Sequence, residues 1–593
     1  MTAGRRAATL HLKRDAPLSK PARAQAYCPA VPAHPRAGRA LDLRCWLSVP
    51  VAGLAPASRP AWVLLAAAAA ALLPAAPAVA QGQGQGQAPL PPVLLPGPAE
   101  PDTFTLTQVQ VTGGRSVPAS ELQALAAPYL NRPLRLLDVE DLRQRLNREL
   151  VARGLVNSGV VLAPDAVPAL AGGTLRLQLI EGQVTELRQQ GLGGLSPQYL
   201  RSRLLRPGET LQLPELQARF AALLADPLVG QLDARLLPGA ALGQSTLEVD
   251  LKRAPPVQLS LFANNQGAPS VGSTIAGAEL RLLGLTGWGD QFTAVLSRNG
   301  GGEQHDLAWT LPLAARSTTL QLRGARNRSS VVEEPLASLG IASRVDTQEA
   351  TLSHPLLDRA AVRVQVGLAW SRRDSRTTLD GEPFSFNPGE ADGHTRVHSW
   401  RLVQDGTWRD ERRVLALRST FSFGRHGGAT DGTVPGQPRR DYRLWLGQAQ
   451  ASLPLGDSAS QLLLRGTLQH SGHALVPLEQ LGLGGRHTVR GFRENTLVRD
   501  RGWAVSAEGQ FPLLGGDGAR RRLQGVGFVD AAEGRNVGGP AQRLASAGLG
   551  LRGQFDDWEA DLYIARRLER RPIDTHGDLQ DHGIHLSVRW RAF

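Results

Sequence analysis

The sequence predicts a transmembrane β-barrel of 16 antiparallel strands that follows two α/β domains. From Pro256 onward, segments of about ten residues alternate apolar and polar side chains, which fits strands with one face on lipid and one on a wet lumen. The connections between these segments alternate short and long, as they do in transmembrane barrels. Residues 103–254 instead mix helical and strand periodicities. A soluble β-sandwich shares the period of two, but the segment length favours spanning strands.

Residues 1–80 are expected to be an N-terminal extension and a signal peptide. Residues 61–80 form a short apolar stretch rich in alanine, preceded by basic residues and closed by the small-x-small site Ala78-Val79-Ala80. A membrane anchor is the alternative interpretation. Residues 1–40 are polar, basic and rich in proline, which indicates either a misassigned start or an extended signal peptide. After residue 80, no stretch approaches the roughly 18 apolar residues of a spanning helix.

Cleavage after Ala80 predicts a mature protein that begins at or near Gln81 and has no cysteine, because Cys28 and Cys45 are the only two. Disulfides and thiol-ligated metals are then not expected. Mass spectrometry of the N-terminus of the membrane-purified protein measures this. An N-terminus that retains Cys28 or Cys45 would contradict both expectations.

Charge and motifs argue against nucleic-acid binding and catalysis. The net charge is +13, but the arginines recur at alternate positions of the expected strands, which favours a polar barrel interior, and no nucleic-acid partner is expected. Residues 548–553 match GxGxxG, yet no helix pattern follows them, so a dinucleotide site is not indicated. HExxH, GxSxG and Walker sequences are absent, and the 13 histidines lack metal-ligand spacing. We expect no enzymatic activity, no cofactor and no metal.

The domain boundaries follow from composition and periodicity. Residues 81–102 are a linker rich in Pro, Gly and Gln. The α/β domains are expected at 103–182 and 183–254, and the barrel at 255–593. The first domain is expected to have a strand at 104–111. Asp138 should then cap a helix with the apolar face Val139, Leu142, Leu146 and Leu150.

In the second domain, two helices are expected. Ser196-Pro197 opens one with a cap and a first-turn proline, and Leu213 to Ala225 form the other. In the barrel, the expected strands begin near residues 256, 276, 290, 302, 317, 345, 360, 395, 412, 440, 460, 501, 521, 541, 557 and 583. The long connections are expected at 325–344, 373–394, 425–439, 471–500 and 567–582. An even number of strands returns the C-terminus to the side of the α/β domains.

The most specific motif lies in the connection between the eleventh and twelfth expected strands, which is the sixth surface loop. A Gly-rich segment there ends in Val489-Arg490-Gly491-Phe492; Phe528-Val529-Asp530 follows in a later strand, and the chain ends on Phe593. Together these resemble the VRGF/Y loop, the FxD strand and the terminal Phe of two-partner secretion transporters, the TpsB family of haemolysin-activator-like and adhesin-transporter-like proteins in the BamA-like superfamily. Asn265-Gln266-Gly267 and residues 283–290 also resemble the first hairpin of that family, with Asn264 where an acidic residue is usual.

The resemblance implies that the α/β domains are POTRA domains and that the VRGF loop folds back into the barrel. Arg490 would meet Asp530 on the inner wall of the thirteenth strand as a directional, charge-assisted pair. Gly484, Gly485 and Gly491 would let the backbone turn sharply. An ordinary Gly-rich surface hairpin is the alternative. Some family members carry a pore-plugging helix before the POTRA domains, but residues 81–102 lack helical periodicity, so none is expected here.

The last strand carries the expected barrel-assembly signal, Trp590 and Phe593. The barrel-assembly machinery engages such a strand by strand addition. Phe593 has the opposite parity to Trp590, and a bulge near Ala592 would reconcile the two.

The resemblance implies a monomeric pore in the bacterial outer membrane, with POTRA domains in the periplasm. Its partner would be a large TpsA-like exoprotein with an N-terminal secretion domain, in addition to outer-membrane lipid and the barrel-assembly machinery. The nature of the exoprotein (adhesin, haemolysin or contact-dependent toxin) stays open. Two rival functions remain: a barrel-assembly-type insertase, which should have more POTRA domains, and a passive porin, which has no need of POTRA domains or the VRGF/FxD pair.

Overall fold

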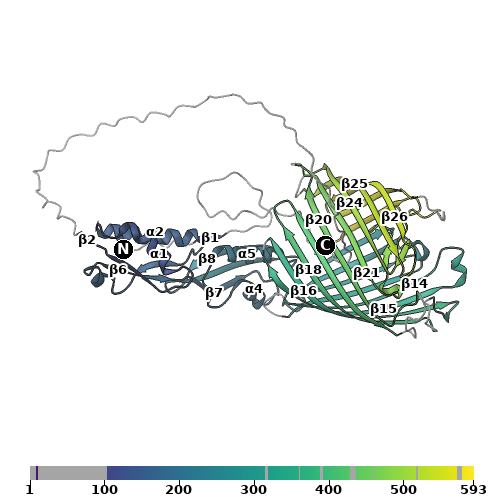
Figure 1. The fold of residues 1–593 in the computed structure, drawn as a ribbon, viewed down its shortest axis with the longest axis horizontal. Coiled ribbons are helices and arrows are strands. Elements are labelled where there is room, and N and C mark those ends of the chain that lie inside the picture. Colours follow the sequence, from purple (N-terminus) through teal and green to yellow (C-terminus); the bar gives the residue numbers. More distant parts are fainter. Residues whose placement is uncertain are drawn as a thin grey trace, which may run out of the picture.

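The computed structural model describes residues 8–10 and 103–593, except 314–317, 360, 387–391, 428–435, 457–458, 516–518 and 570–576. Two α/β units lie in line at one end of a β-barrel (Figure 1). The expected signal peptide, both cysteines and the linker with its question of a plug helix lie outside the described residues. Within these described ranges, no helix is long and apolar enough to cross a membrane.

The first α/β unit packs its helices against a small sheet. Strand β3 pairs in parallel with β6, and β5 pairs antiparallel with β6. The predicted apolar face of the long helix is confirmed, because its four leucine and valine residues are all buried. The elements are β2 (Phe104–Thr105), β3 (Gln108–Thr112), α1 (Ala119–Ala126), η1 (Ala127–Tyr129), β4 (Pro133–Leu134), α2 (Leu136–Ala152), β5 (Gly159–Leu162), α3 (Ala166–Leu170) and β6 (Thr174–Ile180).

Two details of this unit differ from the expectation. Asp138 is the third residue of α2, and the N-cap residue is Arg135. The Asp138 carboxylate accepts a hydrogen bond from the Arg135 N–H at 2.7 Å, so it still satisfies a backbone donor at the helix start. The expected strand at 104–111 is divided into β2 and β3, which belong to different sheets.

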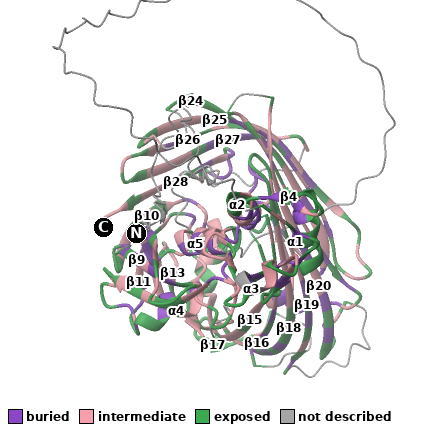
Figure 2. Ribbon diagram, turned by 90° about the vertical axis from the view of Figure 1, so that its left-hand side faces the viewer, coloured by how far each residue is buried: buried purple, intermediate pink, exposed green. Residues whose placement is uncertain are grey.

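The second α/β unit contains β7 (Gln183–Gln190), α4 (Pro197–Leu204), α5 (Leu213–Leu224), β8 (Val229–Pro238) and β9 (Gln244–Arg253). The Ser196 cap is confirmed, since its side chain accepts the Gln198 N–H at 3.3 Å. The sheet order is β1-β8-β9-β7, in which β1 (Ala8–Leu10) adds to the outer edge of β8. Viewed from the α/β units, helices α1, α2 and α5 lie over the ring of barrel strands (Figure 2).

Hydrogen bonds on several sides join the two units. The Leu213 N–H donates to the Gly154 carbonyl at 2.8 Å, where α5 begins and α2 has just ended. The Glu181 carboxylate accepts from the Ser116 backbone on one side and from the Thr210 hydroxyl, at 3.1 Å, on the other. Contacts that originate from several elements restrict rotation about the short connection between the units.

The barrel is closed and has 16 main antiparallel strands, as the sequence predicts. A two-residue strand, β17 (Glu382–Pro383), pairs with the end of β16. The main strands are β10 (Val257–Asn264), β11 (Ile275–Leu283), β12 (Gln291–Arg298), β13 (Gly302–Pro312), β14 (Thr319–Ser330), β15 (Ala342–Asp358), β16 (Val362–Leu379), β18 (His394–Arg409), β19 (Val414–His426), β20 (Asp441–Pro454), β21 (Gln461–Ser471), β24 (Arg501–Leu514), β25 (Arg521–Arg535), β26 (Gln542–Phe555), β27 (Trp558–Arg567) and β28 (Ile584–Arg591).

The two faces of the strands differ as the alternation predicts. In β19, Leu417, Phe421 and Phe423 are exposed on the outer face, whereas Thr420 and Ser422 are buried on the inner face. Ion pairs between strands line the inside: Arg323 with Asp306 and Arg418 with Asp405 join neighbouring strands, and Arg589 of β28 reaches across β10 to Glu279 of β11. The frequent arginines therefore serve the wet interior of the barrel.

Two of the expected long connections are shorter than predicted. Strand β14 runs to Ser330 and β15 starts at Ala342, so much of 325–344 is strand. Likewise, β16 continues to Leu379 and takes up the first part of 373–394. Polar, Arg-rich strand ends at the cell surface look like loop in the sequence, because both faces of these extensions are in water.

The second α/β unit is fixed to the barrel through the turn between β11 and β12. Leu283 is buried in the hydrophobic core of that unit, although it belongs to a barrel strand. Arg253 donates to the carbonyl oxygens of Gly193 and Leu283, and the Ser196 N–H donates to the Gly287 carbonyl at 2.8 Å. Inside the turn, the fully buried Asp290 accepts from Thr286 and from the Trp309 indole.

A candidate loop lock inside the barrel

The connection between β21 and β24, residues 472–500, enters the barrel; we call it L6. Its two legs pair as β22 (Leu481–Leu483) and β23 (Leu497–Arg499), and the VRGF residues lie between them. The Asp500 carboxylate holds the base of L6, because it accepts from the backbone of Leu475 and Val537. The loop is thus a folded hairpin with its own fixed base.

Arg490 at the tip of L6 is buried against the inner wall, with a side chain only 2% exposed. Its Nε and Nη2 donate to the two carboxylate oxygens of Asp530 on β25, each at 2.8 Å, and its backbone N–H donates to the same carboxylate. The guanidinium stacks on the Phe528 ring, 3.5 Å from the centroid. The three residues singled out in the sequence are therefore in direct contact.

The neighbours of Arg490 complete the fit of the loop tip. Val489 and Phe492 are buried in one cluster with Leu497 of the loop and with Ala532 and Leu544 of the wall. Gly491 has a φ of +91°, and a Cβ there would lie 2.9 Å from the Ala565 Cβ. Gly484, Gly485 and Gly491 all have a positive φ, which agrees with the sharp backbone turns expected at these glycines. Apolar packing and the positive φ of Gly491 thus hold the VRGF segment next to β27.

Sequence reasoning missed a second acid at Arg490. The Glu508 carboxylate of β24 accepts from Nη1 at 2.6 Å and is fully buried, and the Ser506 hydroxyl accepts from Nη2 at 3.0 Å. One signal was available, because an acidic side chain in the middle of a membrane-spanning strand generally faces the interior and has a partner. Arg490 therefore forms ion pairs with two buried carboxylates, not one.

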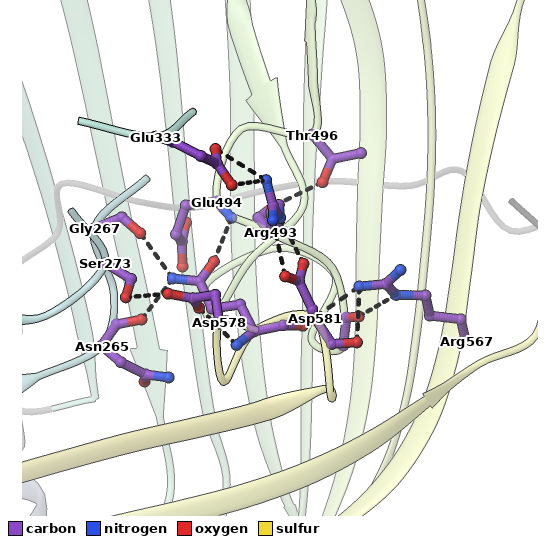
Figure 3. Close-up of polar contacts among 12 residues, drawn as sticks. Asn265, Gly267, Ser273, Glu333, Arg493, Glu494, Thr496, Arg567, Asp578 and Asp581 are labelled. Carbon is purple, nitrogen blue, oxygen red and sulfur yellow. Dashed lines mark hydrogen bonds and ion pairs between the residues drawn. The ribbon is translucent and has the colours of Figure 1, made fainter. Parts of the chain in front are cut away.

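The outer part of L6 makes a second set of contacts, with other loops (Figure 3). Arg493 forms a bidentate pair with Asp581, at 2.5 and 2.8 Å, and an ion pair of 2.9 Å with Glu333. The Glu494 N–H donates to the Gln580 side chain at 2.8 Å. Burial raises the pKa of the Glu494 carboxyl to about 7, against the lowering influence of the Arg486 N–H that it accepts. None of these residues was predicted from the sequence.

Comparison with known proteins identifies the family. Residues 243–553 match the model of the haemolysin secretion/activation protein family ShlB/FhaC/HecB, and residues 104–182 match the ShlB-type POTRA domain. The chain belongs to the haemolysin secretion/activation family. The first α/β unit is a POTRA domain, and the second has a similar helices-on-sheet architecture. The protein is thus an outer-membrane transporter that secretes a partner exoprotein, with its POTRA region in the periplasm.

Individual relatives agree with this assignment. The outer membrane transporter CdiB of Dickeya dadantii (strain 3937) is 25% identical over 433 residues, which cover 70% of this chain and 74% of that protein. The heme/hemopexin transporter protein HuxB of Haemophilus influenzae (strain 86-028NP) is 26% identical over 194 residues, or 32% of this chain and 34% of HuxB. The structure of CdiB from Escherichia coli shares the fold, with a TM-score of 0.64 at 19% identity over 84% of this chain and 92% of that chain.

In this transporter the site holds a loop against the inner wall of the barrel. Within the described ranges, no cluster of three or more His, Cys, Asp or Glu side chains is placed to bind a metal. A buried guanidinium between two carboxylates is strongly held, because its removal deprives both carboxylates of their nearest cation in a poorly solvated place. The contacts are nevertheless all noncovalent and reversible.

The C-terminal strand of the transporter closes the barrel against β10. The Ala592 N–H donates to the Leu259 carbonyl at 2.9 Å, and the Leu259 N–H donates to the Phe593 carbonyl at 3.0 Å. Two residues thus face one, which is a β-bulge at the expected place. As a result, Trp590 and Phe593 are both exposed on the outer face despite their opposite parity.

Proposed function

We propose that this transporter binds its exoprotein as an extended segment along the edge of β8 that β1 occupies in the structure. The exoprotein then passes through the lumen after L6 has moved away from the inner wall of the barrel. The observation that supports capture is a strand already added there: Ala8–Leu10 pairs antiparallel with residues 234–236 of β8. Strand addition uses backbone hydrogen bonds, which accept many sequences. Cleavage of the expected signal peptide would remove Ala8–Leu10 and free this edge for the exoprotein.

The position of β8 supports the same proposal. The edge belongs to the α/β unit that is joined to the barrel through Arg253 and Leu283, so a captured segment lies near the barrel entrance. From there the path leads into a lumen lined by paired charges and occupied by L6. L6 in this position obstructs the passage of a polypeptide through the lumen. Transport therefore requires Arg490 to give up its contacts with the inner wall.

Site-specific cross-linking tests the docking edge. A photoreactive amino acid at Arg235, exposed on β8, is expected to cross-link to the N-terminal secretion domain of the partner exoprotein. The matched control is Gln190, exposed on β7 at the opposite edge of the same sheet, which should give little product. Equal or stronger cross-linking at Gln190 would contradict docking on β8.

The proposal includes several further assignments. The exoprotein is large and adhesin-like or haemolysin-like, and the transporter catalyses no covalent step. The closed barrel needs no second copy for its hydrogen bonding, which supports a monomer in outer-membrane lipid. The exposed Trp590 and Phe593 of the last strand are the signal for the barrel-assembly machinery. The VRGF residues and the Phe528-x-Asp530 pair act together as the loop lock.

The rival functions have less support. A passive porin works with an open lumen, whereas here Arg490 and Gly491 hold a loop inside the barrel. An insertase of the same superfamily would use the edge of the last strand, but β28 is paired with β10 over Ser260–Asn264. Two α/β units also fit the shorter periplasmic region of a dedicated exoprotein transporter.

A further inference from the structure

The seam of the barrel, where the first and last strands meet, has an unusual upper end. Strand β10 pairs with β28 over five residues, while β10 pairs with β11 over eight and β27 with β28 over seven. The last seam pair is Asn264 with Ser587. Residues Ile584–Leu586 of β28 therefore extend beyond the paired end of β10, toward the cell surface.

The side chain of Asn265 completes the seam there. The Asn265 N–H donates to the Leu586 carbonyl at 3.2 Å. Its side-chain oxygen then accepts the Leu586 N–H at 2.8 Å, and its Nδ2 donates to the Ile584 carbonyl at 2.9 Å. One amide side chain thus replaces a further backbone pair, and Asn265 is 4% exposed.

The side chain of Gln580 connects this end of the seam to L6. Its Nε2 donates to the carbonyl oxygens of Asn265 and Gly267, each at 2.7 Å, and its Oε1 accepts the Glu494 N–H of L6 at 2.8 Å. Gln580 is fully buried. Its three hydrogen bonds use both amide protons and one lone pair of the oxygen, so the amide has no spare donor to compensate for a lost partner.

L6 also holds the β28 side of the seam directly. The Gly491 N–H donates to Nε2 of His585 at 2.9 Å, and the Gly491 carbonyl accepts from Arg567 at 2.6 Å. Arg493 holds Asp581, which lies three residues before the start of β28 (Figure 3). Both strands of the seam thus end in segments whose polar groups are satisfied by the loop.

We propose that Asn265 and Gln580 are positioning residues that close the cell-surface end of the seam, and that this closure depends on L6 being seated. The step rests on the proposed release of L6 during transport. When the loop leaves, Gln580, Asp581 and His585 each lose a partner in a buried place, and an unsatisfied buried polar group is costly. The upper ends of β10 and β28 then separate. The departure of L6 from the lumen and the widening of the barrel therefore occur together.

Hydrogen–deuterium exchange on the full-length transporter in proteoliposomes tests the proposal without any exoprotein. Asn265→Ala and Gln580→Ala are expected to speed exchange about tenfold at residues 263–267 and 584–587, the effect of one or two net hydrogen bonds. Arg493→Ala, which leaves both amides intact, should do the same through the loop. Ser399→Ala removes a buried 2.8 Å hydrogen bond to Ser371 on another wall and should leave the seam unchanged.

The variants distinguish the two parts of the inference. Unchanged seam exchange in Asn265→Ala and Gln580→Ala would overturn the role of the amides. Faster exchange in these two but not in Arg493→Ala would overturn the dependence on L6. If Asn265→Ala does not assemble, Asn265→Asp retains the acceptor for the Leu586 N–H and removes the donor to the Ile584 carbonyl, and exchange over the segment 584–587 must still be faster. Because no exoprotein is present, failure of docking on β8 would not affect any of these results.

Discussion

Arg490→Ala is expected to lower secretion at least tenfold while a folded barrel still reaches the outer membrane. The change leaves the carboxylates of Asp530 and Glu508 without their common partner, and breaking a buried ion pair costs about 3–5 kcal/mol. L6 then has no defined seat and obstructs the lumen in many positions. Secreted exoprotein, channel conductance and heat-modifiable mobility of the barrel measure the three parts of this result.

Asp530→Ala should have the smaller effect, because Arg490 keeps Glu508 at 2.6 Å. The Arg490→Ala/Asp530→Ala double variant should be little worse than Arg490→Ala alone, since both changes remove one interaction. Simple addition of the two effects would mean that the pair does not act as a unit.

Arg490→Lys is the finer test: it retains the charge and loses the planar fork that spans Asp530, Glu508 and Ser506. Full secretion by Arg490→Lys would show that charge alone holds the loop.

Deleting residues 103–182 is expected to abolish secretion and to leave the barrel in the membrane. The first α/β unit has a hydrophobic core of its own, and the hydrogen bonds that close the barrel do not involve it. Secretion should fail because the second unit, whose β8 edge is proposed to receive the exoprotein, loses the hydrogen bonds that fix it to the first unit. Immunoblots of culture supernatant and of the cell surface measure the loss.

The control for this deletion is a full-length transporter with a weakened joint between the two α/β units. Thr210→Ala removes one hydrogen bond to Glu181 and keeps the unit in place. It should secrete close to normal amounts. Normal secretion by the deletion variant would contradict a role of the first unit in receiving the exoprotein.

The barrel was predictable because membrane strands obey a strict alternation. Each of the 16 strands begins within three residues of its expected start, the largest difference being Ala342 against 345. Their upper ends were not predictable, because outside the lipid a polar strand and a polar loop have the same composition. Contacts such as Arg490 with Asp530 could be expected from a family motif, whereas Gln580 with Asn265 could not. These two residues are 315 apart in the chain, and a single Gln carries no local signal.

The turn between β11 and β12 also bears on the direction of force. Leu283 is part of two structures at once, a strand of the barrel and the core of the second α/β unit. A polypeptide that folds outside the cell would pull on the portion still bound to the second α/β unit. Because Leu283 is packed in the core of that unit, this tension would be transmitted directly to the barrel. We therefore expect the second α/β unit to keep one orientation relative to the barrel entrance, whichever segment of the exoprotein it binds.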